Sequence, residues 1–303
     1  MQPSTEHDWT IHALNIHGAF FERWAATAMV KQPDWRVRST NYPVKIPPNP
    51  KVGGNESTID IVAQRTTGDV LATLTVECKK NNPKLINWVF FRSLTPRQVR
   101  VPTLAFGMYD IDQPPGWYVV RRLVEASQIV VDDGRETRSD YLSYKDKKDK
   151  TRTANAAIND GAYQVALGLQ ALVWEELYRA GAYDEASRTE DLPERVWTAQ
   201  TFLPVVLTTA RLKVASFEPE KVNPLSGEIR FEDVVLSDVP YLIYDYALPR
   251  HLQAANMRIE HLLTEDSVNL WSRLQIAFVS SDAIGKFLAS DLVAEVCGGA
   301  GSA

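Results

Sequence analysis

Cysteine is nearly absent from this chain, and long apolar runs are missing. The only cysteines among the 303 residues are Cys78 and Cys297, which give neither a disulfide framework nor a zinc-ligand set. No apolar run approaches the roughly 20 residues of a membrane helix. Residues 1–8 lack the basic and apolar regions of a signal peptide. We therefore expect no membrane partner and a location in the reducing cytoplasm.

Several well-known catalytic signatures are also absent. The chain has no phosphate-binding Gly-x-x-x-x-Gly-Lys loop, no GxGxxG after a strand, no HExxH and no GxSxG elbow. The histidines His7, His12, His17, His251 and His261 lack the spacing of metal ligands. These absences argue against P-loop, dinucleotide-binding, zinc-protease and α/β-hydrolase chemistry.

Positive charge is in short supply. Lys and Arg number 33 against 38 Asp and Glu, which gives a net charge of −5. A protein that binds nucleic acid usually carries a basic patch, so this chain would have to gather its positive charge locally. The basic residues that follow the most informative strand are the candidates: Lys79, Lys80, Lys84, Arg92, Arg97 and Arg100.

That strand is predicted at residues 68–80, where a Gly-Asp turn precedes a β-branched, apolar run. The even-numbered positions form an apolar face, and the odd-numbered face becomes polar and ends in Glu77 and Lys79. Two charges at the end of a buried strand cost free energy unless they are paired or bind a metal. The alternative is an ordinary Glu/Lys pair on an exposed edge strand.

A second acidic residue lies in the preceding predicted strand, residues 57–64. Asp60 stands within Ile-Asp-Ile-Val, although Asp is depleted in strands. Pairing across the turn at residues 66–69 would bring Asp60 beside Glu77. Two converging carboxylates suit Mg²⁺, which accepts few protein ligands and completes its shell with water and phosphate. The alternative is an Asp satisfied by backbone donors.

A third carboxylate belongs to an amphipathic helix predicted at residues 9–30. Glu22 has Gly or Ala at the positions three and four residues away on both sides, so another element can approach it closely. The alternative is a Glu exposed on the helix surface.

This arrangement resembles the PD-(D/E)xK nuclease superfamily, with Glu22, Asp60, Glu77 and Lys79 as the matching residues. One departure is Ile59, where the family has proline. The resemblance implies an α/β (mixed α+β) fold with a restriction-endonuclease-like core, a central mixed sheet flanked by helices. It also implies hydrolysis of nucleic acid, with DNA as the expected substrate, using Mg²⁺ or Mn²⁺. Asp60, Glu77 and the backbone carbonyl of Cys78 would be the metal ligands, and Lys80, Lys84, Arg92 and Arg97 the nucleic-acid-binding residues.

A competing acid-x-Lys match, Asp146 to Lys148, shows that spacing alone is not specific. It follows Asp132 and Asp133 at a plausible distance, but it lies in a charged run without apolar residues. The strand context therefore favours Glu77 and Lys79.

The resemblance also orders the rest of the chain. We expect a nuclease-like domain over residues 1–220, with a segment inserted at about 96–150, and a C-terminal extension over 221–303 packed on the core. A short helix is predicted at 84–94. A helix at 153–180 and a strand or strand pair at 202–215 would complete the core, and Gln164 on that helix is a possible cleft residue.

Two other functions remain open at this point. The chain could be a nuclease-fold module that binds nucleic acid or a protein without cleaving, although the intact Asp60, Glu77 and Lys79 set argues against that. It could also be an α/β interaction protein in which Glu77 and Lys79 form a structural ion pair. A homodimer is also possible, since a double-strand cut commonly needs two sites.

Overall fold

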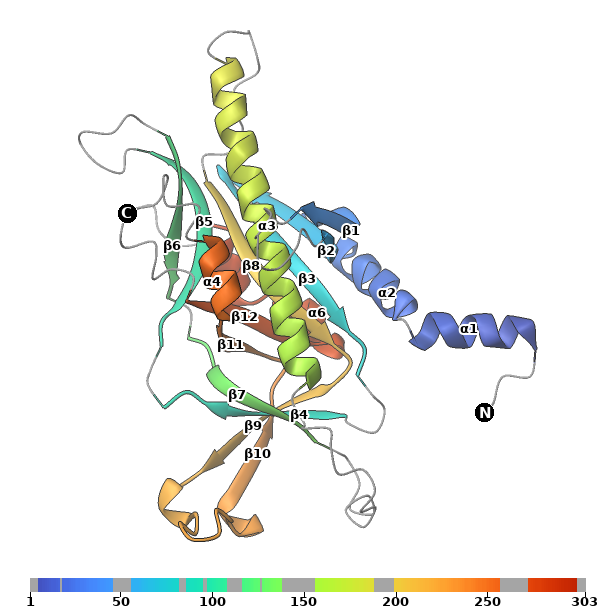
Figure 1. Ribbon diagram of the computed structural model, residues 1–303, viewed down its shortest axis with the longest axis vertical. Helices are drawn as coiled ribbons and strands as arrows, with labels where there is room; N and C mark the ends of the chain where they lie inside the picture. The colour runs from blue at the N-terminus through green and yellow to red at the C-terminus, as the bar shows by residue number, and fades with distance from the viewer. Residues whose placement is uncertain are drawn as a thin grey trace.

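The structure is a computed structural model of the chain, and it places twelve strands in one mixed sheet with helices on both faces (Figure 1). The mixed α/β class with a large central sheet agrees with the sequence prediction. The residues that the structure describes are 5–16, 18–45, 56–81, 86–94, 97–107, 116–125, 127–137, 156–187, 199–256 and 272–298.

The helix predicted at residues 9–30 is divided into α1 (Glu6–Ile16) and α2 (Ala19–Val30). Gly18 caps α2 with φ of 79°, a left-handed conformation that glycine adopts without steric cost. Because this turn redirects the chain, α1 extends away from the sheet while α2 packs on it through Ala25 and Met29 (Figure 1).

Three antiparallel strands follow: β1 (Arg36–Lys45), β2 (Glu56–Thr67) and β3 (Val70–Lys79). The predicted turn joins β2 to β3, and Gly68 has φ of 57° there. The paired residues run from Thr67 opposite Val70 to Ile61 opposite Val76. This register brings Asp60 to the end of the ladder, at the level of Glu77.

The long helix α3 (Ala156–Ser187) and the strand β8 (Ala199–Thr208) complete this part of the sheet. β8 runs parallel to β3, with Glu77 opposite Val206. α3 crosses β2, β3 and β8 (Figure 1). The helix continues past its predicted end at Gly181, since the residues that follow this glycine include good helix formers such as Glu185 and Ala186.

The segment between β3 and α3 enlarges the same sheet. It contains β4 (Asn87–Arg92), β5 (Val99–Gly107), β6 (Gly116–Val124) and β7 (Val130–Thr137). The predicted helix at 84–94 was wrong: residues 88–90, Trp-Val-Phe, favour a strand and are buried between β7 and β9. β5 pairs with β6 and with β8.

The last part of the chain also contributes strands. After β9 (Arg211–Phe217) come the short helices η2 (Pro219–Lys221) and η3 (Phe231–Asp233), and then β10 (Val234–Asp238) and β11 (Tyr241–Ala247). They are followed by α4 (Arg250–Asn256), β12 (Arg273–Ser280), η6 (Ser281–Ala283), α6 (Ile284–Leu288) and α7 (Asp291–Val296). β12 lies in the sheet between β8 and β11, so the segment predicted to pack on the core supplies part of the sheet itself. The strand order is β1-β2-β3-β8-β12-β11-β7-β4-β9-β10.

The two faces of the sheet carry separate hydrophobic clusters. Ala72, Leu74 and Val76 of β3 belong to the cluster that includes residues of α2, α6 and α7. The alternate residues of β3 face α3, whose buried side chains belong to the other cluster. Glu77 and Lys79 therefore lie on the α3 face. No helix in the described part of the chain is both long and apolar enough to span a membrane.

Candidate active site

The end of the β2–β3 ladder holds the candidate carboxylates. Asp60 lies one residue beyond the last pair of the ladder, and its Oδ2 accepts a hydrogen bond of 2.8 Å from the backbone N–H of Cys78. This bond to the chain just after Glu77 fixes Asp60 beside the end of β3. The hairpin register that the sequence indicated thus brings the two acidic residues together.

Glu77 and Lys79 form an ion pair, with 2.9 Å between Oε1 of the carboxylate and Nζ of the ammonium. The side chain of Glu77 is only 10% exposed. The same ammonium donates a hydrogen bond to Oε1 of Gln164 on α3. Lys79 is therefore held between a buried carboxylate on its own strand and an amide on the helix above it.

Glu22, in the first turn of α2, interacts electrostatically with Asp60. Its pKa is raised first by burial and then by the negative charge of Asp60. A Cβ atom added at Gly18 would lie 3.8 Å from Oε1 of Glu22. The turn that begins α2 therefore also leaves room for this side chain.

The site has an excess of negative charge. Burial and the charge of Asp60 raise the pKa of Glu77 to about 7, against the opposing effect of Lys79. Burial also raises the pKa of Asp60, while the Cys78 amide and Lys79 lower it. Lys79 forms the one ion pair that the structure gives to these carboxylates among the described residues, so another cation would stabilise the ionised site.

The donor set fits a hard divalent cation. Carboxylate oxygens are the ligands that Mg²⁺ prefers, and Mg²⁺ usually binds through one or two of them while keeping several waters. Asp60, Glu77 and the Cys78 carbonyl could supply such ligands. Within the described ranges, no three His, Cys, Asp or Glu side chains are grouped closely enough to enclose a metal ion together.

Sequence reasoning missed two glycines that let α3 approach the sheet. A Cβ atom at Gly161 would lie 3.2 Å from Cγ of Lys79 and from Cγ1 of Val206. One at Gly168 would lie 2.6 Å from Cγ1 of Ile59. Residues seven apart share a helix face, so this spacing was a usable signal in the sequence.

The predicted nucleic-acid contacts are dispersed. The ammonium of Lys80 donates to the carbonyl oxygen of Asn15 at the end of α1, next to the candidate site. Lys84 lies outside the described residues, and Arg92 is exposed at the end of β4. Arg97 instead pairs with Asp245 at 2.7 Å. Asp245 lies on β11, which is the third strand from β3 in the sheet.

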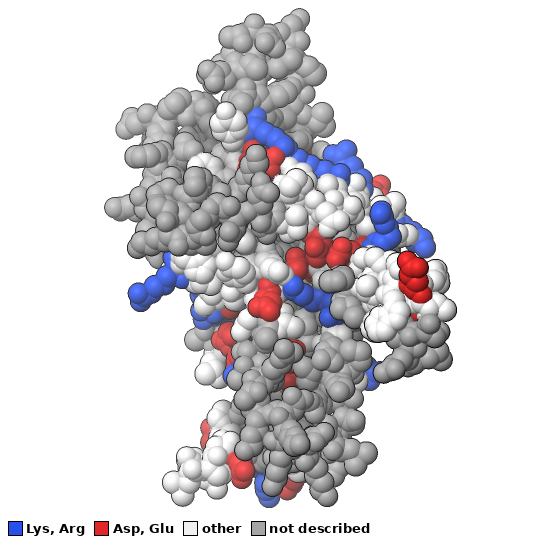
Figure 2. Space-filling model, turned by 45° about the vertical axis from the view of Figure 1, so that its right-hand side comes forward, with Lys and Arg blue, Asp and Glu red and all other residues white. Residues whose placement is uncertain are grey.

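Figure 2 shows the molecule with the side on which α2 and the first strands lie turned towards the viewer. Acidic side chains gather near its middle, and basic side chains lie beside and above them. Both signs of charge are therefore present on this face.

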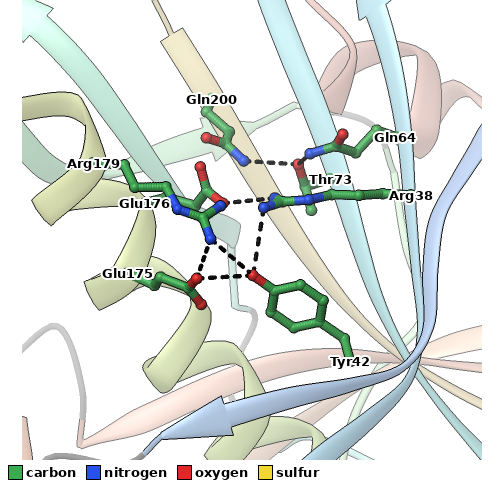
Figure 3. Close-up of polar contacts among 8 residues, drawn as sticks. All are labelled: Arg38, Tyr42, Gln64, Thr73, Glu175, Glu176, Arg179 and Gln200. Atoms are coloured by element: carbon green, nitrogen blue, oxygen red, sulfur yellow. Dashed lines mark hydrogen bonds and ion pairs between the residues drawn. The ribbon is translucent and has the colours of Figure 1, made fainter. Parts of the chain in front are cut away.

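A second charged cluster lies under the same helix, and we call it the β1–α3 network (Figure 3). Arg38 Nη1 and Arg179 Nη1 lie 2.6 and 3.1 Å from Oε1 of Glu176. Glu175 pairs with Arg179 and accepts a 2.9 Å hydrogen bond from the hydroxyl of Tyr42. Two arginines thus balance two glutamates, and the cluster fastens α3 to β1.

A neutral polar chain lies beside this network (Figure 3). Thr73 Oγ1 accepts hydrogen bonds from the amide groups of Gln200, at 2.9 Å, and Gln64, at 3.3 Å. These bonds satisfy the buried hydroxyl of Thr73 on the polar face of β3.

Comparisons with family models, with curated proteins and with solved structures found no match to this chain.

Proposed function

We propose that this protein is a metal-dependent nuclease with a restriction-endonuclease-like core that hydrolyses phosphodiester bonds, with DNA as the expected substrate. The observation that carries the proposal is the meeting of Asp60 and Glu77 at the end of β3, where Glu77 pairs with Lys79 and the charges of Asp60 and Glu22 act on Glu77. A buried carboxylate beside other acids is costly in a purely structural role and useful for binding a cation.

The chain topology supports the same proposal. A helix, three antiparallel strands, a second helix and a strand parallel to the third follow one another as α2, β1, β2, β3, α3 and β8. This is the order that the resemblance implied, with the insertion between β3 and α3.

Each site residue has a role that its surroundings support. Asp60 and Glu77, with the Cys78 carbonyl, would hold Mg²⁺ or Mn²⁺. When bound, the metal would supply positive charge that polarises the phosphodiester and activates a water. Lys79, held by Glu77 and Gln164, would position that water, help its deprotonation by stabilising the hydroxide that forms, or stabilise charge on the phosphate. Glu22 would assist a second metal or orient a water.

A cleavage assay tests the proposal. Plasmid, linear and single-stranded DNA and RNA are incubated with the protein in Mg²⁺, Mn²⁺ or EDTA. Glu77→Gln should abolish metal-dependent cleavage. Glu176→Gln is the matched control, because Glu77 and Glu176 are both 7% exposed but only Glu77 lies in the site. Equal cleavage by wild type and Glu77→Gln would overturn the assignment, and no cleavage by wild type would favour a binding module.

A further inference from the structure

Two arginines pair with one buried carboxylate on the other face of the sheet, and two more lie close to this pair. Arg97 Nη1 and Arg273 Nε lie 2.7 and 3.0 Å from Oδ2 of Asp245, whose side chain is only 2% exposed. Arg121 donates to the backbone carbonyl of Arg273. Arg100 lies next to these residues: its backbone N–H is bonded to Gln275, which shares a strand face with Arg273, and its guanidinium donates to Oε1 of Gln98 at 3.4 Å. We call Arg97, Arg100, Arg121 and Arg273 the arginine cluster.

The arginine cluster is held in place by an amide side chain. Gln275 Oε1 accepts a 2.6 Å hydrogen bond from the backbone N–H of Arg100, and Gln275 Nε2 donates to the carbonyl of Gln98 at 2.9 Å. These bonds fix the segment that carries Arg97 and Arg100 against β12. The guanidinium groups are therefore presented by anchored backbone.

Charge in the arginine cluster is unbalanced. Asp245 is the one carboxylate that pairs with these arginines among the described residues. The pKa of Arg121 is lowered by burial and then by the nearby charge of Arg100. Guanidinium groups this close repel one another, and an anion between them would remove the repulsion.

The arginine cluster is separate from the candidate active site. Asp245 shares a strand face with Ile243, which belongs to the hydrophobic cluster opposite α3. β11 lies three strands from β3, or about 14 Å at the usual spacing of strands. An anion bound here would not lie among Glu22, Asp60 and Glu77.

We propose that Arg97, Arg100, Arg121 and Arg273 form a binding site for a phosphate group. Guanidinium forks match the oxygens of phosphate and bind it with paired, charge-assisted hydrogen bonds. Asp245 holds Arg97 and Arg273 in position. Arg100 and Arg121 supply further positive charge, since neither of them forms an ion pair with a carboxylate of the described residues. This site does not depend on the nuclease proposal.

Isothermal titration of the full chain with inorganic phosphate, at an ionic strength held constant with NaCl, tests the site. Saturable binding is expected, with Arg100→Gln weakening it about tenfold, because an exposed guanidinium is lost without breaking the Asp245 pairs. Arg121→Gln should weaken it similarly. Lys286→Gln, which removes an exposed charge from α6, should bind as wild type does. Absence of saturable binding, or unchanged binding by Arg100→Gln with a native circular dichroism spectrum, would overturn the proposal.

The source of the phosphate is distinguished by two further titrations in EDTA, one with ATP and one with short double-stranded DNA. Weaker binding of ATP alone by Arg100→Gln would assign a nucleotide, and weaker binding of DNA alone would assign a nucleic acid backbone. Weaker binding of both supports phosphate as the recognised group. If Arg100→Gln binds both as wild type does, the proposal fails.

Discussion

Helix α3 covers two clusters of charged side chains that differ in their charge balance. In the β1–α3 network, Arg38 and Arg179 face Glu175 and Glu176. In the candidate active site, Lys79 pairs with Glu77 and its charge also acts on Asp60, while the charges of Asp60 and Glu22 help to raise the pKa of Glu77 to about 7.

Burial does not explain this difference, because Glu77 and Glu176 are each 7% exposed. Glu176 lies between two guanidinium groups, whereas Glu77 shares one ammonium with other acids. A balanced cluster stabilises the fold, and an acidic excess leaves charge that a bound cation can neutralise. We therefore propose that Glu176 serves structure and that Glu77 serves function.

The largest expected effect is on catalysis. Glu77→Gln should lower cleavage by about 1000-fold or more, since a metal supplies several kcal/mol of charge stabilisation. The free energy of unfolding should stay the same or rise, because the variant removes a buried charge. Cleavage rates and urea unfolding measure both. A large loss of stability with retained cleavage would show that Glu77 has the structural role assigned to Glu176.

The reverse pattern is expected for the β1–α3 network. Glu176→Ala should lower the free energy of unfolding by about 2 kcal/mol, because it leaves Arg38 and Arg179 without their shared partner. Cleavage at a temperature where the variant is folded should remain near that of wild type. A loss of cleavage by the folded variant would contradict the separation of the two clusters.

The pH dependence of stability should also distinguish the clusters. The pKa of Glu77 is raised from its ordinary 4.5 to about 7, so the folded state binds more protons than the unfolded state between these values. The metal-free protein should therefore lose stability as pH rises through this window. Glu77→Gln should flatten this part of the urea-unfolding profile, and Glu176→Gln should keep it. A profile for Glu77→Gln that matches wild type would contradict the assignment.

The smallest expected effect concerns the close packing of α3 on the sheet. Gly161→Ala would place a methyl group against Lys79 and Val206, and we expect about a tenfold loss of cleavage with little change in stability. Gly168→Ala is the comparison, since its methyl group would meet Ile59 instead. It should lower stability more and cleavage of the folded protein less. Equal effects of both variants on cleavage would show that Gly161 does not position Lys79.

Local sequence pattern predicted the parts of the fold in which neighbouring elements pair. The alternation of β3 and the turn at Gly68 were enough to bring Asp60 to Glu77. Gln164 on α3 was a candidate from its place on the predicted helix, but its bond to Lys79 spans 85 residues and needed the tertiary structure.

Long-range pairing could not be predicted in the same way. β4 is a strand because it is sandwiched between β7 and β9, which lie far along the chain. The positions of Arg97 beside Asp245 and of β12 beside β8 likewise depend on distant pairing. The aromatic and β-branched residues 88–90 favour a strand, but nothing in their local sequence indicates which strands it pairs with.

The most direct test of the central claim is isothermal titration calorimetry of the full chain with Mn²⁺. Wild type, Glu77→Gln and Glu176→Gln are compared. If the acidic excess is a cation site, wild type and Glu176→Gln should bind Mn²⁺ with similar affinity, and Glu77→Gln should bind it at least tenfold more weakly. Equal binding by all three proteins, or no binding by wild type, would contradict the claim.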